Sequence, residues 1–413
     1  MIRDYVSSSV DERRLFMNKA KEINKGIYWV GALDYDIRLF DVVMYTEYGT
    51  TYNSYLVKGS EKTALFETVK VKFFDEFLER LNEVSSIDEI DYIVVNHTEP
   101  DHVGSIAKIL DMNPDVTIVG TAMAIKFLKE ITNKSFKSII TKEGSTLELG
   151  DRTVEFIMAP FLHWPDTMYS YIKEEKTLIT CDSFGCHYCD EKLFNDKIEG
   201  DFIDSYKYYF DVIIGPFKPY VLQALKKISN IDIDIICPGH GPILRKDLDK
   251  YLELYKTWAT EEKREKPSVV IAYVSAYGYT EKIAEKVAEG VKTVDGLDVL
   301  VYDLVETKKD EVMNEINLAN GLLLGSPTIV SDALPPIWDI LTSLNPIIHK
   351  GKLAGAFGSY GWSGEAVSNI EGRFKQLRFK MPVEGLKIKF NPSDEQLNDA
   401  YEFGKKFGEA VIG

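Results

Sequence analysis

Seven side chains that can bind metal ions lie between residues 97 and 240, each at or just past the end of a predicted β-strand. They include four of the six histidines of the chain. Histidine and carboxylate groups are the ligands that borderline transition metals prefer. Seven such groups can hold two ions, provided that one carboxylate bridges them. The series consists of His97, Glu99, Asp101, His102, His163, Asp182 and His240.

The length of 413 residues exceeds what one hydrophobic core usually serves, so two domains are expected. A charged segment, TEEKREKP, spans residues 260–267 and ends in Pro267. This composition is typical of the end of a helix followed by a linker. We therefore place one domain at residues 1–262, a linker at 263–267 and a second domain at 268–413.

The formal net charge is −16 and no basic stripe is present, which argues against nucleic acid and anionic membranes as partners. The acidic surface either confers solubility or offers a docking face to a small carrier protein. No apolar run has the length of a signal peptide or a membrane span. Four cysteines without a disulfide-scaffold pattern suit a reducing compartment, so we expect a cytoplasmic protein.

Strands and helices are mixed in the first half of the chain. The stretch Phe73–Val84 has helical spacing, with Phe74, Phe77, Leu78 and Leu81 on one side. Strands are predicted at Tyr55–Phe66, Asp91–Asn96, Thr153–Met158, Thr177–Cys181 and Ile233–Cys237.

After residue 267 the pattern becomes a regular alternation of strand and helix. SVVIAYVSA is an apolar strand, and TEKIAEKVAEGVKTV is a helix with Ile283, Val287 and Val291 four residues apart. LDVLVYDL, GLLLGSP and KLAGAFGSY are further strands. The last helix is expected to open at Ser393, with Gln396 three residues on as in a capping box. Such alternation predicts a parallel sheet covered by helices on both faces.

The metal-binding side chains come from separated segments of the first half. VVNHTEPDHVG follows a β-branched strand, and the other donors lie in FLHWPD, LITCDSFG and CPGHGP, each in a loop after a short apolar run. Strand ends with adaptable loops are where sites are usually built. We therefore expect these donors to converge at one edge of the sheets.

Three loops of the second half have the composition of a nucleotide site. In AYVSAYGYTEKIA a strand ends in a loop that opens a helix, where backbone N–H groups and hydroxyls can bind a phosphate. The loop is neither a GxGxxG dinucleotide motif nor a Walker loop. Ligands of open α/β sheets bind at the carboxyl ends of the strands, which all three loops would satisfy. The candidate residues are Ser275, Tyr277, Gly278, Tyr279, Thr280, Ser326, Pro327, Thr328, Ile329, Ser359, Tyr360, Gly361, Trp362, Ser363 and Gly364.

The aromatic residues of these loops have two possible roles. Tyr360 and Trp362 could border a flat aromatic ring while backbone groups bind its polar edge. Tyr277, Tyr360 and Trp362 could instead be ordinary packing residues.

The order HxExDH, His, Asp, His resembles the metallo-β-lactamase fold, an αββα sandwich with a binuclear site. Most hydrolases of that fold have histidine at the second position and bind zinc, whereas this chain has Glu99. A harder, anionic oxygen ligand shifts the preference toward iron. The second half resembles flavodoxin, which implies FMN as the mononucleotide. Together the two halves resemble the flavodiiron proteins over nearly the whole chain, from YWVGALDYDIRLF to the GSYGWSG loop.

This resemblance implies a fold and a ligand set. Residues 1–262 would form a metallo-β-lactamase-like diiron domain, and residues 268–413 a flavodoxin-like, doubly wound parallel sheet that binds FMN. His97, Glu99 and His163 would bind one iron, and Asp101 and His240 the other, with Asp182 as the bridge. Members of the family differ in whether the histidine at the position of His102 is a ligand, so its role stays open.

The resemblance also implies an activity and partners. Family members pass electrons through FMN to a non-haem diiron centre that reduces O2 to water, NO to N2O, or both, in a detoxification role. They typically form head-to-tail homodimers, or dimers of dimers, that place the flavin of one subunit beside the irons of the other. No pair of CxxC motifs of the rubredoxin type occurs in the chain. We therefore expect an external electron donor, a rubredoxin-type carrier or a reduced deazaflavin.

Two other functions stay open at this point. One is a zinc-dependent hydrolase of the metallo-β-lactamase fold with a flavodoxin-like regulatory domain. The other is an electron carrier whose metal site is vestigial. Glu99 argues against the hydrolase, and the complete ligand set argues against the carrier.

Several residues depart from the family pattern. Cys181, Cys186 and Cys189 have the C-x4-C-x2-C spacing of a ferredoxin cluster, but we expect small hydrophobic residues and loop packing instead. His187 could line the access of the substrate or donate a proton, but a place in a surface loop is the main expectation. Asp41 stands where some family members have a histidine near the irons.

The sequence also suggests roles for four further side chains. Trp164, Phe161 and Phe184 are candidates for a dry pocket at the metals, or simple core residues. His349 lies outside the flavin loops and is expected to be structural.

Overall fold

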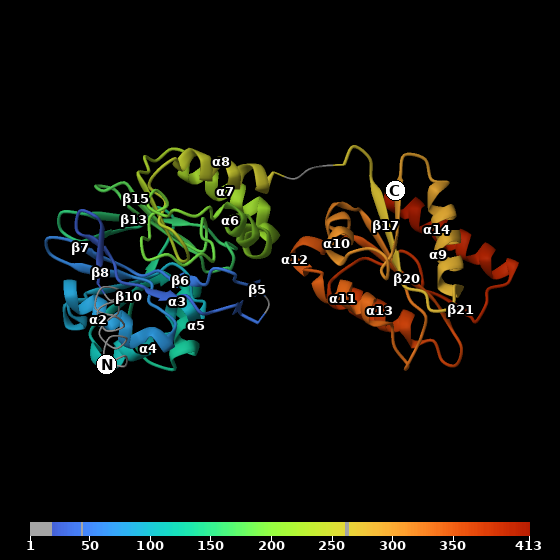
Figure 1. The fold of residues 1–413 in the computed structure, drawn as a ribbon, viewed down its shortest axis with the longest axis horizontal. Helices are drawn as coiled ribbons and strands as arrows, with labels where there is room; N and C mark the ends of the chain where they lie inside the picture. The colour runs from blue at the N-terminus through green and yellow to red at the C-terminus, as the bar shows by residue number, and fades with distance from the viewer. Residues whose placement is uncertain (1–18, 43, 261–263) are drawn as a thin grey trace, which may run out of the picture. The chain divides into compact units, whose positions relative to one another are not determined.

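A computed structural model describes residues 19–42, 44–260 and 264–413 (Figure 1). The chain divides into two compact units after Thr260. Within the described residues, no helix is long and apolar enough to cross a membrane. Residue 263 of the expected linker lies outside the described residues, and the linker bounds stay a prediction.

Two mixed sheets form the centre of the first unit. The first has the strand order β1 (Lys21–Asn24), β2 (Ile27–Trp29), β7 (Tyr55–Lys58), β8 (Thr63–Phe66), β9 (Tyr92–Val95), β10 (Thr117–Thr121) and β11 (Lys137–Thr141). The second has the order β12 (Thr146–Glu148), β13 (Thr153–Met158), β14 (Met168–Ile172), β15 (Thr177–Cys181) and β16 (Ile235–Pro238). Two short ladders lie beside them and join β3 (Ala32–Asp34) to β6 (Thr50–Tyr52) and β4 (Leu39–Phe40) to β5 (Met44–Tyr45).

Apolar side chains of both sheets share one core, which places the sheets face to face. Phe66 and Val94 of the first sheet pack in one buried cluster with Phe156 and Ile179 of the second. A second cluster joins the other faces to helices. These helices are α2 (Phe74–Val84), α3 (Pro100–Val103), α4 (Ile106–Met112), α5 (Ala122–Thr132), α6 (Ile203–Tyr209), α7 (Lys218–Ile228) and α8 (Leu248–Ala259). The expected αββα sandwich is confirmed.

The second unit is a five-stranded sheet in which all neighbouring strands are parallel (Figure 1). Its order is β18 (Asp298–Asp303), β17 (Ser268–Tyr273), β19 (Gly321–Gly325), β20 (Leu353–Tyr360) and β21 (Leu386–Lys389). Its helices are α9 (Tyr279–Lys292), α10 (Lys309–Leu318), α11 (Pro335–Ser343), α12 (Pro346–His349), α13 (Glu365–Gln376) and α14 (Asp394–Ile412). One buried cluster contains residues of α10, α11 and α13, and another contains residues of α9 and α14. This is the predicted doubly wound sheet.

Most of the predicted elements agree with the structure, and one does not. The strands at Thr153–Met158 and Thr177–Cys181 and the capping box of Ser393 and Gln396 are confirmed. The single strand expected at Tyr55–Phe66 is wrong, because this stretch is a hairpin of β7 and β8. The N–H of Gly59 donates to the carbonyl of Lys62, which closes the turn between them.

His349 is buried at the end of α12, as expected of a structural residue. Its Nε2 lies 2.9 Å from Oδ1 of Asn317, and its Nδ1 lies 3.0 Å from the N–H of Asn345. Nδ1 also lies 2.8 Å from the carbonyl oxygen of Asn345, so both ring nitrogen atoms have polar partners. Burial lowers the pKa of His349 to about 4, from 6.5.

We therefore expect the second unit to lose stability as the pH falls from about 6.5 to 4. In that range the unfolded chain binds a proton at His349 that the folded unit excludes, at a cost of roughly 3 kcal/mol when complete. Calorimetry of the full chain at several pH values measures the effect, with His349→Gln as the control that lacks this proton. An equal pH dependence in both proteins would contradict the assignment.

Candidate functional site

The seven candidate metal ligands all lie at one edge of the first unit. His97 follows β9, and Glu99, Asp101 and His102 lie at the start of α3 or within it. His163, Asp182 and His240 follow β13, β15 and β16. The short buried strand YIVV and the helix start at Pro100 hold the first four in one tight turn. The sequence thus brings all seven side chains to the same place through the ends of its strands.

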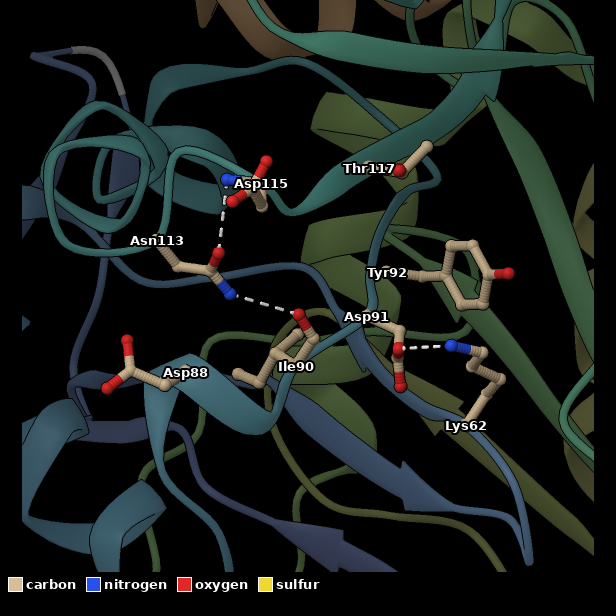
Figure 2. A pocket seen from close by; sticks show the side chains of 8 residues that line it. All are labelled: Lys62, Asp88, Ile90, Asp91, Tyr92, Asn113, Asp115 and Thr117. Carbon is tan, nitrogen blue, oxygen red and sulfur yellow. Dashed lines mark hydrogen bonds and ion pairs between the residues drawn. The ribbon is translucent and has the colours of Figure 1, made fainter.

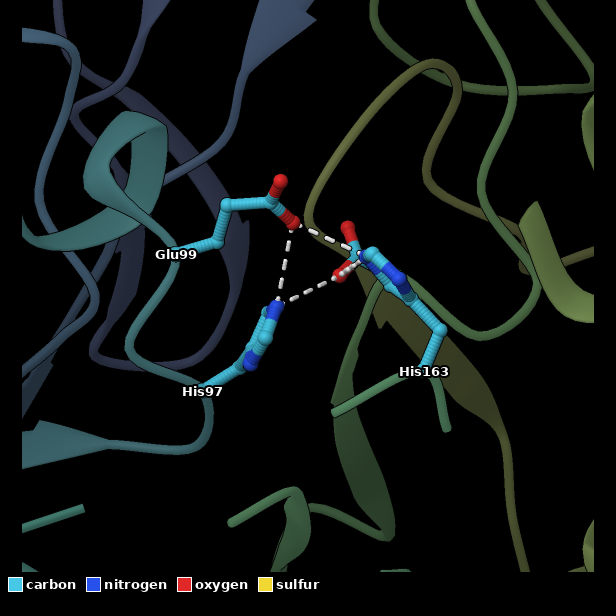
Figure 3. A group of neighbouring side chains, drawn as sticks. His97, Glu99 and His163 are labelled. Atoms are coloured by element: carbon cyan, nitrogen blue, oxygen red, sulfur yellow. Dashed lines mark hydrogen bonds and ion pairs between the residues drawn. The ribbon is translucent and has the colours of Figure 1, made fainter. Parts of the chain in front are cut away.

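The first group surrounds Oε2 of Glu99 (Figure 3). This oxygen lies 3.2 Å from Nε2 of His97 and 2.8 Å from Nε2 of His163. Atoms of His97, Glu99, His163 and Asp182 lie within 4.8 Å of one another. Four ligand atoms at this spacing match the size of a site for one metal ion.

A second group lies on the other side of Asp182. Oδ2 of Asp101 lies 3.1 Å from Nε2 of His240, and Oδ1 of Asp182 lies 3.1 Å from Nε2 of His102. Ligand atoms of Asp101, His102 and His240 fall within 4.8 Å of one another. His102 therefore lies with the second group.

Asp182 is the side chain that both groups share. Its carboxylate oxygens lie 3.1 to 3.6 Å from Nε2 of His97, His102, His163 and His240. Its two oxygens divide between the groups, since Oδ2 faces His97 and His163 while Oδ1 faces His102 and His240. A carboxylate in this position can bridge two ions.

The charges of the donors fit metal ions. Burial alone would lower the pKa of His97, but the carboxylates of Asp166 and Glu99 raise it to about 10. Burial would raise the pKa of Asp182, but the surrounding histidines, His102 foremost, hold it well below its usual range. Buried oxygens of Asp101 and Asp182 lack hydrogen-bond partners among the described residues. Orphaned carboxylate oxygens beside imidazoles are what a metal cluster would satisfy, and metal binding would displace the protons of the histidines.

Three contacts around the donors were not predicted from the sequence. Nδ1 of His240 lies 2.6 Å from the carbonyl oxygen of Thr51. The hydroxyl of Tyr209 donates to Oδ1 of Asp182 at 3.0 Å. Oδ1 of Asp166 lies 3.6 Å from Nδ1 of His97, with both side chains completely buried. The signal for Asp166 was its place in FLHWPD, three residues after His163, whereas Thr51 and Tyr209 carried none.

The expectation that His187 lies in a surface loop is wrong, because its side chain is buried. Its Nδ1 lies 2.8 Å from the hydroxyl of Thr50, and its ring packs against Phe40 and His240 at centroid distances of 4.2 and 5.1 Å. The first unit folds the β4–β5 ladder and β6 over this loop, which sequence periodicity could not show. His187 therefore belongs to the apolar wall beside the second group.

Other side chains near the donors occupy varied places. Trp164 packs edge-on against His97 at 5.1 Å between centroids, and Phe184 is buried against Tyr255. Phe161 is 37% exposed and does not form a dry wall. Burial, and then the charges of Glu99 and Asp101, raise the pKa of Asp41 to about 6, which places this carboxyl beside the site.

The four cysteines are free and buried. Cys237 packs in the core between the two sheets, and Cys186 in the core that the helices cover. Cys181 shares a buried group with Glu67 and His102. The burial of Cys181 agrees with the expected small hydrophobic residue, and that of Cys186 and Cys189 agrees with packing of their loop.

The three candidate flavin loops meet at the carboxyl edge of the second sheet. They follow β17, β19 and β20. After β17 the chain adds β18 on one side of it and then crosses to add β19 on the other side, so the strand order reverses at β17. The hydroxyl of Thr280 lies 2.9 Å from that of Ser359, and the N–H of Thr328 donates to the carbonyl of Ser359. The structure thus joins the first, second and third loops by direct contacts.

The same edge has the features that a mononucleotide needs. Gly278, with φ of +76°, is the N-cap residue of α9, and the hydroxyl of Ser275 accepts a hydrogen bond from the N–H of Glu281. Tyr277 and Trp362 are the loop rings with most surface, 80% and 97% exposed. Helix starts bind phosphate, and ligands of open α/β sheets bind at the point where the strand order reverses. The ordinary packing role does not suit Tyr277 and Trp362, whereas it stays open for Tyr360, which is partly buried.

A separate polar hollow lies at the opposite end of β9 (Figure 2). It is lined by Lys62, Asp88, Ile90, Asp91, Tyr92, Asn113, Asp115 and Thr117. Lys62 pairs with Asp91 at 2.7 Å, and Lys137 pairs with Asp115. Because it lies at the amino ends of β9 and β10, it has no part in the metal site.

Comparisons with known proteins agree with this architecture. The family described as ODP family beta lactamase matches residues 50–241, and the flavodoxin family matches residues 271–404. The flavo-diiron protein FprA2 of Clostridium acetobutylicum is 38% identical over 399 residues, which are 95% of this chain and all of that protein. The nitric oxide reductase of Moorella thermoacetica is 37% identical over 402 residues, 96% of this chain and all of that protein.

A solved structure shows the same likeness. The rubredoxin oxygen:oxidoreductase from Desulfovibrio gigas superposes with a TM-score of 0.68 at 31% identity, covering 95% of this chain and 99% of that one. Both halves of the chain and their order are shared with these proteins. The chain therefore belongs to the flavodiiron protein family.

Proposed function

We propose that the protein is a flavodiiron oxidoreductase that reduces O2 to water, NO to N2O, or both, in a detoxification role. The main support for this proposal is the position of Asp182, which contacts the histidines of two donor groups at once. The names of the relatives, a nitric oxide reductase and a rubredoxin oxygen:oxidoreductase, support both gases.

In this proposal two irons occupy the two groups. His97, Glu99 and His163 bind one, Asp101, His102 and His240 bind the other, and Asp182 bridges them. His102 is included because its Nε2 faces Asp182 at 3.1 Å, within the second group. The carboxylates of Glu99, Asp101 and Asp182 offset most of the charge of two ferrous ions, and the glutamate at position 99 favours iron over zinc. The hydrolase alternative has less support, since the whole-length relatives carry oxidoreductase names.

The electron count fits this pair of cofactors. Reduction of O2 to two waters takes four electrons and four protons, and reduction of two NO to N2O and water takes two of each. When bound, reduced FMN supplies two electrons and two ferrous ions supply one each. The chain's own residues hold the ligands in place and exclude water, with Trp164, Phe40 and His187 in the wall of the site.

The partners and the location of the protein are part of the proposal. A rubredoxin-type carrier or a reduced deazaflavin delivers the electrons, which the name of the Desulfovibrio gigas relative supports for the carrier. A head-to-tail homodimer, alone or paired in a dimer of dimers, brings the flavin of one subunit to the irons of the other. The free cysteines support a reducing, cytoplasmic location.

The iron-loaded and FMN-loaded protein is reduced anaerobically and then supplied with O2 or with NO, in parallel. Turnover with each gas tests the function. We expect reduced donor to be consumed catalytically with at least one gas, and the rate per chain to fall on dilution below the dimer dissociation constant. Two bound zinc ions and no oxidation of the flavin by either gas would contradict the proposal. A constant rate in a demonstrated monomer would contradict the dimer.

Replacing Thr280 with Ala is expected to weaken FMN binding about 10- to 100-fold, as loss of a hydrogen bond to a charged group costs roughly 1.5–3 kcal/mol. The iron content should not change. Flavin fluorescence during titration of the FMN-free protein measures the affinity. Thr293→Ala is the matched control, because its hydroxyl donates to the carbonyl of Gly290 at the far end of the same helix. Equal affinities of both variants would count against a phosphate site at the start of α9.

A further inference from the structure

The imidazole of His97 has polar neighbours on both of its nitrogen atoms. Nε2 faces the candidate metal position, 3.2 Å from Oε2 of Glu99 and 3.3 Å from Oδ2 of Asp182. Nδ1 faces Oδ1 of Asp166 at 3.6 Å. A histidine that binds a metal through Nε2 carries its proton on Nδ1, and that proton needs an acceptor.

Asp166 is held where it can be that acceptor. Its Oδ2 accepts hydrogen bonds from the N–H of Thr98 at 2.9 Å and from the hydroxyl of Thr98 at 2.7 Å. Its carbonyl accepts from the hydroxyl of Thr121 at 3.1 Å. Since Thr98 follows His97 in the chain, the carboxylate is fixed to the segment that carries the histidine.

The facing atoms have no other use. Neither Nδ1 of His97 nor Oδ1 of Asp166 has a hydrogen-bond partner among the described residues. Both side chains are completely buried, so water cannot readily satisfy them. The 3.6 Å between them is beyond an ordinary hydrogen bond, but it is short enough for an ion pair between a carboxylate and an imidazolium.

We propose that Asp166 is a positioning residue that fixes His97 with its proton on Nδ1 and so presents Nε2 to the metal of the first group. Asp166 touches no metal itself and acts through His97. The inference rests on the proposed binuclear site, and it adds a residue whose place in FLHWPD gave no ligand role.

The isosteric variant Asp166→Asn tests this tautomer directly. The N–H of Thr98 can only donate, so the amide oxygen of Asn must face Thr98. The NH2 group then faces Nδ1 of His97, which can satisfy it only by accepting. This favours the tautomer with its proton on Nε2, which cannot bind a metal through that atom. We expect metal affinity at the first group to fall about 10- to 100-fold.

Anaerobic titration of the metal-free, FMN-loaded protein with Co2+ measures each site by its visible absorbance. The second group is the internal control, and its affinity should not change in the variant. Asp115→Asn is the control at an exposed carboxylate, which pairs with Lys137. Asp166→Asn with the affinity of the wild-type protein at both sites would overturn the inference.

Asp166→Ala separates positioning from packing. Ala removes the acceptor and leaves room for water, but it does not impose the wrong tautomer, so we expect a smaller loss of affinity than with Asn. If packing were the only role, the cavity left by Ala would do more harm than isosteric Asn, and that order would overturn the inference. The comparison of Asn with the wild-type protein stands even if the Ala variant fails to fold.

The outcome for the wild-type protein distinguishes two failures. Fewer than two metal ions bound per wild-type chain would contradict the binuclear site and the proposed function. Two ions bound with equal affinity in the wild-type protein and in Asp166→Asn would leave the function standing and contradict only the role of Asp166.

Discussion

Replacing Asp182 with Ala is expected to abolish gas reduction while FMN stays bound. Its oxygens contact all four histidines of the two groups. Its removal therefore takes one ligand from each metal position and removes the bridge between them. Loss of an outer-sphere partner alone typically costs 10- to 100-fold, so loss of a shared ligand should cost more than about 100-fold in turnover. Iron content per chain should fall from two to one or none, measured by metal analysis together with anaerobic turnover.

Asp232→Ala is the matched control, because Asp232 is an exposed carboxylate of the same unit that pairs with Lys176. It should keep both irons and full activity. Bound FMN and an unchanged circular dichroism spectrum would show that Asp182→Ala is folded. Turnover that persisted with both irons retained would refute the bridging role of Asp182.

The metal donors were predictable because each follows a strand with a clear signal. The apolar strand YIVV ends two positions before His97, and TLITC ends directly before Asp182. Parallel pairing of β15 with β16 brings His240 beside Asp182. In such a fold the position of a donor in the sequence is close to its position in space. The flavin loops follow the same rule, since β17, β19 and β20 are parallel neighbours.

The residues that sequence reasoning missed lack such a signal. His187 lies in an irregular segment, and its burial depends on Thr50 and Phe40, which are more than 130 positions away. The sequence pattern predicts one strand across the hairpin at Gly59, because apolar residues continue on both sides of a turn of only four residues. Local periodicity cannot predict burial that distant segments create, and it cannot detect a short turn inside an apolar run.

The partners of the donors show the same limit. Thr51 accepts from His240 through its backbone carbonyl, which any residue type could provide. Tyr209 contacts Asp182 from α6, a helix whose register toward the site cannot be read from its sequence. Asp166 could be noticed in FLHWPD, but only the fold shows that it faces His97 rather than a metal.

Replacing Glu99 with His is expected to exchange the metal preference of the first group. Oε2 of Glu99 is the atom that lies between His97 and His163, so the variant would have three imidazoles and the Asp182 carboxylate around that position (Figure 3). Neutral nitrogen ligands suit zinc, while an anionic oxygen stabilises the ferric state. With iron and zinc offered in equal amounts, we expect the variant to take mainly zinc at this site. Gas reduction should then fall by at least about 100-fold, because zinc has no redox change.

Glu99→Gln separates the effect of the charge of the ligand from the effect of its ligating atom, oxygen or nitrogen. It keeps an oxygen of similar reach and removes the negative charge, so we expect an intermediate iron-to-zinc ratio and intermediate activity. Metal analysis after anaerobic reconstitution, followed by turnover with each gas, ranks the three proteins. If Glu99→His took two irons and reduced gas at the rate of the wild-type protein, the carboxylate at position 99 would not determine the metal. If the Gln variant matched the wild-type protein while the His variant lost iron, the oxygen atom rather than its charge would decide the preference.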